Sequence, residues 1–175
     1  MRSNLGPGFR ARFLGLCVPP LVFAVLDGLL TIAGQSAVYW SNHSASNEAN
    51  PVFSALLQSH PMAFLAGLTL WLVLLAAIIV VLPRMFALIL SITITFGHTI
   101  GSGSWLFDHF DIGYNLANGY YLLSACILGL GISYAFSLPD LKEERVLHVS
   151  DALRLRIGAG LFGLAALLYL VPWKL

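Results

Sequence analysis

The chain has 175 residues, of which 58% are hydrophobic and only 10% are charged, and its mean hydropathy is +0.84. Soluble domains are about half apolar and about a quarter charged, so this composition argues against a water-soluble protein. The formal net charge of +1 argues against a nucleic-acid-binding protein, which needs a basic stripe, and the high hydrophobicity argues against a disordered chain.

Five stretches of the chain are long and apolar enough to cross a bilayer, whose core of about 30 Å requires about 20 residues of helix. They are predicted at residues 13–34, 62–82, 85–107, 114–136 and 157–173. Each is expected to be helical because unpaired backbone groups are too costly in lipid. The sequence therefore predicts an all-α, polytopic membrane protein whose single transmembrane domain, residues 1–175, contains five helices.

The positive charges predict the orientation of these spans. Eight of the nine Lys and Arg residues lie before the first span, between the second and third, or between the fourth and fifth, and Lys174 alone lies on the other side. The positive-inside rule then places the N-terminus in the cytoplasm and the C-terminus outside. Residues 35–61 become an outer loop without Lys or Arg, and residues 137–156 become a cytoplasmic loop.

Two ionisable residues, Asp27 and His98, lie well inside predicted spans. At about 1.5 Å per residue, Asp27 lies about 21 Å beyond the start of the first span, and His98 lies about 20 Å beyond the start of the third. Both therefore belong to the outer half of the membrane. Ionisable groups at such depth are costly and mark candidate functional sites. Thr31 follows Asp27 by four residues and shares its helical face.

Further polar residues fall in the same outer layer. In the third span, a mostly polar face at helical spacing should point into the bundle; it comprises Ser91, Thr95, His98, Ser102 and Trp105. Glu48 and Asn50 lie in the outer loop, Asp108 lies in the short outer turn, and Asn115 and Asn118 begin the fourth span. The inner halves of the helices are almost purely apolar. The sequence thus predicts an outward-facing polar pocket, with candidate ligand-binding residues Thr31, Asn50, Ser102, Asp108, Asn115 and Asn118.

Two chemistries and one structural role are open to Asp27, Glu48 and His98 if they share a cavity. Imidazole and carboxylate bind a divalent metal such as zinc, which would activate water, although no paired His motif supports a metal site. The carboxylate of Asp27, paired with that of Glu48 or Asp108, could instead work as a general acid–base pair. Alternatively, Asp27 could bond to neighbouring helices and simply hold the bundle together. The three residues are therefore both catalytic and metal-ligating candidates.

Two elements, Asp27-x-x-x-Thr31 in the first span and Glu48-x-Asn50-Pro51 in the outer loop, resemble a family of small prokaryotic membrane domains of unknown function. The likeness covers roughly residues 20–105. It implies a multi-pass protein of the prokaryotic inner (plasma) membrane, and it supplies no activity. Members of that family often carry a Lys early in the second helix, where this chain has Thr69 and Leu70.

The order of motifs is also similar to lipoprotein signal peptidase (signal peptidase II), an intramembrane aspartyl enzyme. Asp27-x-x-x-Thr31 resembles its first-helix Asp-x-x-x-Lys, and Asp108 lies where its first catalytic Asp would fall. Residues 114–118 resemble its Phe-Asn-x-Ala-Asp motif, with Asn118 in place of the second catalytic Asp. The resemblance implies a hydrolase, but an Asn cannot act as the acid–base partner.

Two classes of function follow from these observations. The first is a binding, transport-accessory or complex-assembly protein whose outer pocket holds a small ligand, a lipid head group or a membrane-protein partner, which could be a second copy of the chain. The second is an intramembrane hydrolase that uses Asp27, Glu48 and His98, with or without a metal. The first class is favoured because no catalytic motif is complete. The bilayer is an expected partner in both, and nucleic acid in neither.

Overall fold

The computed structural model describes residues 13–137 and, beyond them, residues 153, 156, 157, 159 and 160. Most of the fifth predicted span and most of the predicted 137–156 loop lie outside the described residues. The count of five spans and the sides of the membrane that hold the two termini therefore stay predictions.

All regular structure within residues 13–137 is helical, in agreement with the predicted class. The elements are η1 (Phe13–Cys17), α2 (Val18–Ala33), α3 (Ala37–Ser41), η2 (His43–Ala45), α4 (Pro51–Ser59), α5 (Pro61–Val81), α6 (Arg84–Ser104), η3 (Trp105–His109) and α7 (Tyr114–Ser137). Among the described residues, four stretches are long and apolar enough to cross a membrane, namely Phe13–Ala33, Pro61–Val81, Arg84–His109 and Tyr114–Phe136. They match the first four predicted spans to within two residues at each end.

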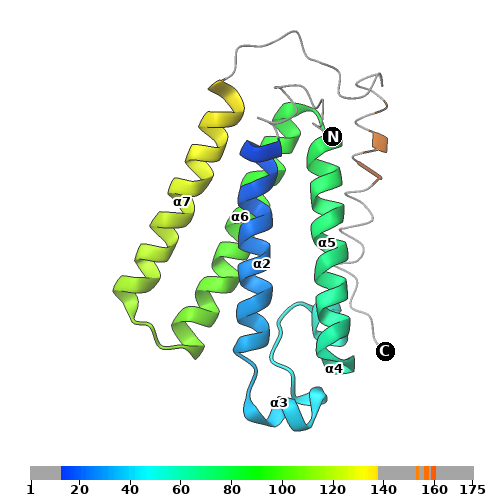
Figure 1. The fold of residues 1–175 in the computed structure, drawn as a ribbon, viewed down its shortest axis with the longest axis vertical. Coiled ribbons are helices and arrows are strands. Elements are labelled where there is room, and N and C mark those ends of the chain that lie inside the picture. The colour runs from blue at the N-terminus through cyan, green and yellow to red at the C-terminus, as the bar shows by residue number, and fades with distance from the viewer. Residues whose placement is uncertain (1–12, 138–152, 154–155, 158, 161–175) are drawn as a thin grey trace, which may run out of the picture.

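The four long helices run roughly parallel or antiparallel, with α2 beside α6 and between α5 and α7 (Figure 1). The tight connection between α5 and α6 defines one end of the bundle, called here the hairpin end. The other end carries α3, η2, α4 and the turn between η3 and α7, and is called the loop end. The most extensive packing is between α2 and α6, so these two helices form the centre of the described bundle.

Prolines and caps explain where several helices begin. Pro19 and Pro20 occupy the first turn of α2, where a missing N–H costs no intrahelical hydrogen bond. The predicted first span is therefore a short π-helical turn followed by an α-helix. Pro51 and Pro61 open α4 and α5 in the same way. The capping side chain before α5 is His60, whose Nδ1 accepts from the backbone N–H of Met62 at 3.1 Å.

The segment predicted as the outer loop, residues 35–61, is more structured than expected, because it contains α3, η2 and α4. Tyr39 of α3 is fully buried, and its hydroxyl donates to the carbonyl of Leu57 in α4 at 3.0 Å. Phe64 and Leu68 of α5 complete this apolar cluster. A core of its own lets the connection fold back against α5 rather than project into water.

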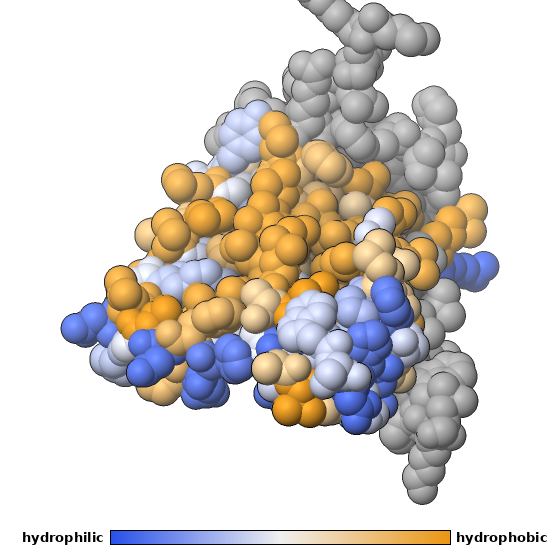
Figure 2. Space-filling model, turned by 60° about the horizontal axis from the view of Figure 1, so that its bottom comes forward, coloured by the Kyte–Doolittle hydropathy of each residue, from blue (hydrophilic) through white to orange (hydrophobic). Residues whose placement is uncertain are grey.

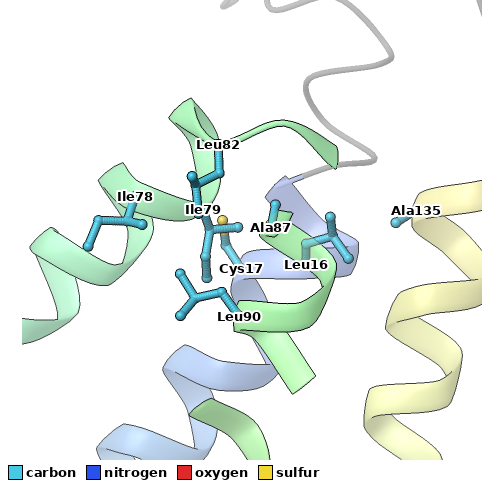
Figure 3. Close-up of a cluster of buried hydrophobic side chains, with 8 residues drawn as sticks. All are labelled: Leu16, Cys17, Ile78, Ile79, Leu82, Ala87, Leu90 and Ala135. Carbon is cyan, nitrogen blue, oxygen red and sulfur yellow. The ribbon is translucent and has the colours of Figure 1, made fainter. Parts of the chain in front are cut away.

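A second apolar cluster closes the hairpin end, with residues from η1, α5, α6 and α7 and from the short α5–α6 connection (Figure 3). It comprises Leu16, Cys17, Ile78, Ile79, Leu82, Ala87, Leu90 and Ala135. Here α7 approaches η1 closely, since a Cβ added to Gly131 would lie 2.6 Å from the carbonyl oxygen of Gly15. Arg84 donates to the carbonyl of Ala135 and stacks 4.0 Å from the ring centroid of Phe136.

Hydrophilic side chains gather at the loop end, whereas the flanks of the long helices are hydrophobic (Figure 2). Many large apolar side chains on these flanks are exposed, among them Leu70 (68%), Phe96 (66%) and Leu122 (69%). A soluble protein would not leave so much apolar surface in water. Surface and helix lengths together are those of a multi-pass membrane protein.

Candidate functional site

The centre of the site is a side-chain hydrogen bond between Asp27 of α2 and His98 of α6. Nδ1 of His98 lies 2.8 Å from Oδ2 of Asp27. The two side chains are each about one-fifth exposed. Both residues were predicted from sequence as membrane-embedded ionisable groups, and the fold brings them into direct contact.

A glycine makes this contact possible. A Cβ added to Gly101 would lie 2.8 and 2.9 Å from the two carboxylate oxygens of Asp27. Such distances are too short for any real side chain, so only Gly at this position lets the carboxylate rest against the backbone of α6. His98 lies one helical turn before Gly101, and the two residues together form the α6 side of the Asp27 environment.

The other ring nitrogen of His98 faces α5. The indole N–H of Trp71 donates to Nε2 of His98 at 3.5 Å. Because Nε2 accepts this hydrogen bond, the proton of a neutral ring is placed on Nδ1, where it is donated to Asp27. The imidazole thus links three helices, and the Asp27–His98 pair in this form carries one negative charge.

Glu48 lies in the loop before α4 and turns its carboxylate toward α2. Its Oε1 accepts from the backbone N–H of Asn50 at 2.7 Å. Burial raises the pKa of Glu48 above its ordinary value of 4.5, and the nearby carboxylate of Asp27 raises it further, while hydrogen bonds from Asn50 and Thr31 lower it. Glu48 is therefore a partly desolvated acid close to a second acid.

The Glu48-x-Asn50-Pro51 element has a clear local role. The Asn50 side-chain oxygen accepts from the backbone N–H groups of Val52 and Phe53 at 3.0 and 3.1 Å, which caps α4. Pro51 then occupies the first helical position. The cap fixes Asn50 at the start of α4, and the backbone N–H of the same residue holds the carboxylate of Glu48.

Gln35 fixes the same loop from the end of α2. Its Nε2 donates to the carbonyls of Thr31 at 2.8 Å and Asn47 at 2.9 Å, and its Oε1 accepts from the N–H of Asn47 at 2.8 Å. Gln35 is only 5% exposed, so these bonds are shielded from water. The paired bonds to Asn47 hold the residue directly before Glu48.

These side chains surround one cavity of about 760 Å³ between α2, α5, α6 and the loop before α4. Its loop end is polar, with Asp27, Thr31, Glu48, Asn50, His98 and Asp108 in the lining. Its far end is apolar and reaches the hairpin-end cluster at Ile78 and Leu90. The cavity is therefore amphipathic along its length.

The apolar wall comes from regular helical faces. In α5 the lining residues follow steps of four and three, and they are Phe64, Leu68, Trp71, Leu75 and Ile78. In α6, the lining contains Leu90, Thr93, Ile94 and Gly97 before it reaches His98. Thr93 and Gly97 are also exposed on the surface of the described bundle. The cavity thus reaches the surface at the depth of the membrane-spanning helices.

Three of the nine predicted site residues do not line the cavity. Ser102 is fully buried on another face of α6, where its hydroxyl contacts the hydroxyl of Tyr120 in α7. Asn115 and Asn118 lie on α7, which does not contribute to the cavity lining. The polar face predicted for the third span is divided as well: Ser91 and Thr95 of α6 are buried away from the cavity, whereas His98 of α6 and Trp105 of η3 line it.

The arrangement offers little to a metal ion. Within the described part of the chain, no group of three or more His, Cys, Asp or Glu side chains is arranged to hold one. Nδ1 and Nε2 of His98 face Asp27 and Trp71, so zinc would have to displace one of these partners. Asp27, Glu48 and His98 remain the residues nearest to such a role, because they share the cavity.

Sequence reasoning missed four residues of the site: Gln35, Trp71, Gly101 and His109. Trp71 lies in a helix that is hydrophobic on all sides, so no periodic pattern distinguishes its inward face. Gln35 acts through the backbone of Asn47, which no sequence pattern reveals. Gly101 lies one turn from His98, a spacing that could have indicated a close approach to another helix.

Comparisons of the chain with protein-family models, curated proteins and solved structures gave no match. The two resemblances read from the sequence therefore stay predictions.

Proposed function

We propose that this protein binds an amphipathic, lipid-like ligand within the membrane, with the polar head at Asp27, Glu48 and His98 and the hydrocarbon tail between α5 and α6. The observation that supports this function is the amphipathic lining of one continuous cavity. Ligand sites are mostly apolar with a few convergent polar groups, and this cavity falls within their usual range of about 300–1,000 Å³.

The length of the cavity favours an elongated ligand over a compact one. Leu90 and Asp108, near its two ends, lie on the same helical stretch, and at about 1.5 Å per residue they are about 27 Å apart. That distance is close to the thickness of a bilayer core, about 30 Å. A tail lying along Leu75, Ile78 and Ile94 would replace lipid contacts with protein contacts of similar polarity.

Photolabelling tests the proposal. The full chain in nanodiscs is irradiated with single-chain amphiphiles that carry a diazirine in the tail and an amine, hydroxyl or carboxylate head, and labelled peptides are mapped by mass spectrometry. Gly97→Phe should block the cavity, because a Cβ at this position meets nothing within 4 Å and the ring can enter the cavity. The matched control is Ile92→Phe, on an exposed face of α6 outside the cavity lining.

We expect labels on the cavity faces of α5 and α6 in the wild type and in Ile92→Phe, and their loss in Gly97→Phe. Equal labelling of the two variants, or labels spread over all lipid-facing helices, would contradict a binding cavity. Correct folding of each variant is checked by its unfolding temperature and its elution from size-exclusion chromatography.

The Asp27–His98 pair favours a second candidate, an intramembrane esterase. A carboxylate that accepts from Nδ1 orients an imidazole as a general base, and Nε2 then takes the proton of an attacking water. The water oxygen would bond to the ester carbonyl carbon, the ester C–O bond would break, and the leaving alcohol would take the proton back from His98. This route requires Trp71 to release Nε2.

Hydrolysis of a long-chain p-nitrophenyl ester tests the second candidate. Turnover by the wild type that His98→Ala abolishes and Asp27→Asn reduces would support it. A wild-type rate equal to that of His98→Ala would eliminate it and leave binding as the function.

A further inference from the structure

The charge of the cavity lining is one-sided. Carboxylates come from Asp27, Glu48 and Asp108, and the described lining contains no Lys or Arg. Asp108 and His109 lie at the exposed rim, whereas Asp27 and Glu48 are partly buried. The cavity is thus acidic at its loop end and apolar toward its hairpin end.

The two inner acids have only neutral hydrogen-bond donors in the described contacts. Because Nε2 of His98 accepts from Trp71, the ring that donates to Asp27 through Nδ1 is the neutral tautomer, and Glu48 accepts from the backbone N–H of Asn50 and from Thr31. Two carboxylates facing one poorly hydrated space repel each other, and each loses hydration. A positive charge between them would relieve both costs, whereas an anionic head would add to them.

The aromatic side chains of the cavity lining also favour a positively charged ligand head. Trp71 of α5 and Trp105 of η3 line the cavity, together with Phe53 of α4 and Phe64 of α5. The face of an aromatic ring attracts an ammonium ion by about 0.5–2 kcal/mol, and it offers no such attraction to an anion or an alcohol.

We propose that the head group recognised at this site is an alkylammonium, held between the carboxylates of Asp27 and Glu48 with its tail along α5 and α6. This inference rests on the proposed function and adds the chemical class of the ligand. A primary ammonium has three donors and no acceptor, which complements two carboxylates. The hydrogen bonds are charge-assisted, the strongest kind available in such a site.

The test compares three tail-diazirine amphiphiles of equal chain length, with amine, alcohol and carboxylate heads, on the full chain in zwitterionic nanodiscs at pH 7.5. Asp27→Asn and Glu48→Gln remove one charge each with little change in shape. The matched control is Asp111→Asn, which removes an acid from the exposed turn outside the cavity; Asn tolerates the positive φ of 46° found there.

We expect the amine to label the cavity faces at least about tenfold more than the alcohol, which corresponds to one charge-assisted hydrogen bond. Asp27→Asn and Glu48→Gln should each remove most of that preference, and Asp111→Asn should keep it. Equal labelling by amine and alcohol, with Gly97→Phe still blocking both, would overturn the ammonium head while leaving the amphiphile site standing. Preference for the carboxylate would also overturn it, and absence of cavity labelling by any probe would remove both proposals.

Discussion

Nδ1 of His98 and Oδ2 of Asp27 meet at 2.8 Å, although the two residues are 71 positions apart in the chain. The contact joins the two most extensively packed helices of the bundle at the level of the cavity. The contact therefore stabilises the packing of α2 against α6 and also positions two side chains in the cavity lining. Substitutions of Asp27 can separate these two roles.

Asp27→Asn should retain most of the stability, because the amide oxygen can still accept from Nδ1 of His98. Asp27→Ala should lower the free energy of unfolding by about 1–3 kcal/mol, since it leaves a partly buried donor without its acceptor. Thermal unfolding in a mild detergent measures both. Equal losses in the two variants would show that the charge, and not the hydrogen bond, stabilises the helix pair.

Gly101→Ala should displace the carboxylate of Asp27, because the new Cβ would lie less than 3 Å from both carboxylate oxygens. We expect a lower unfolding temperature despite the better helix propensity of Ala, which is worth about 1 kcal/mol over Gly. Gly97→Ala is the control on the same helix, since its Cβ meets nothing within 4 Å, and it should be neutral or stabilising. Destabilisation by Gly97→Ala of the same size would point to a general intolerance of α6.

Glu48 should make stability depend on pH. Its pKa is raised in the folded protein, chiefly by burial, so the folded state binds this proton more tightly than the unfolded state does. The resulting stabilisation is fully present below pH 4.5, the ordinary pKa, and is lost as the pH rises through the raised value. The unfolding temperature of Glu48→Gln, relative to the wild type, should therefore increase as the pH rises above 4.5. A difference that is flat with pH would contradict this assignment.

Gln35→Leu should loosen the loop that carries Glu48, because it removes two hydrogen bonds to Asn47 and one to Thr31. The expected loss is about 1–3 kcal/mol, at about 1 kcal/mol per bond. Hydrogen exchange at residues 46–50 should accelerate, and amphiphile labelling should weaken. Gln58→Leu is the control, since that exposed side chain bonds only to Ser54 among the described contacts. Unchanged exchange in Gln35→Leu would mean that the loop is held by other contacts.

The predicted orientation can be tested by cysteine labelling. With Cys17 and Cys126 replaced by Ala, a Cys at exposed Ala45 should react with a membrane-impermeant maleimide in intact cells. A Cys at Ser3 should react only after permeabilisation, because the positive-inside rule places the N-terminus in the cytoplasm. Reaction of both, or the reverse pattern, would overturn the predicted orientation. A Cys at Lys174 that reacts in intact cells would support the fifth span.

The sequence predicted the first four spans closely, because their length and hydropathy are local properties. It could also select Asp27 and His98, since an ionisable residue deep in an apolar helix is unusual wherever the partner lies. It could not tell which neighbours each helix face would meet. For that reason it grouped Ser102 and Asn118 with the site, although both lie outside the cavity lining.

In the connection before α5, the structure contains more order than the sequence predicted. Residues 35–61 have no long apolar run, so they read as an open loop. Their order comes from Tyr39 and Gln35, whose partners are backbone atoms of Leu57 and Asn47. Nearly every residue offers the same backbone groups, so the sequence does not indicate which residue will accept or donate such a hydrogen bond. These contacts are seen only in the folded structure.

If the cavity binds an amphiphile as proposed, the exposed Thr93 and Gly97 in its lining determine how that ligand enters. An amphiphile that enters there arrives by lateral diffusion in the bilayer plane. It has already partitioned from water into the bilayer, and its long axis is already aligned with the lipid chains. Saturation of the site then follows the mole fraction of that amphiphile among the surrounding lipids, and its total concentration in the aqueous phase matters only through partitioning. Diluting the bilayer with inert lipid should empty the site even when the amount of protein and amphiphile is unchanged.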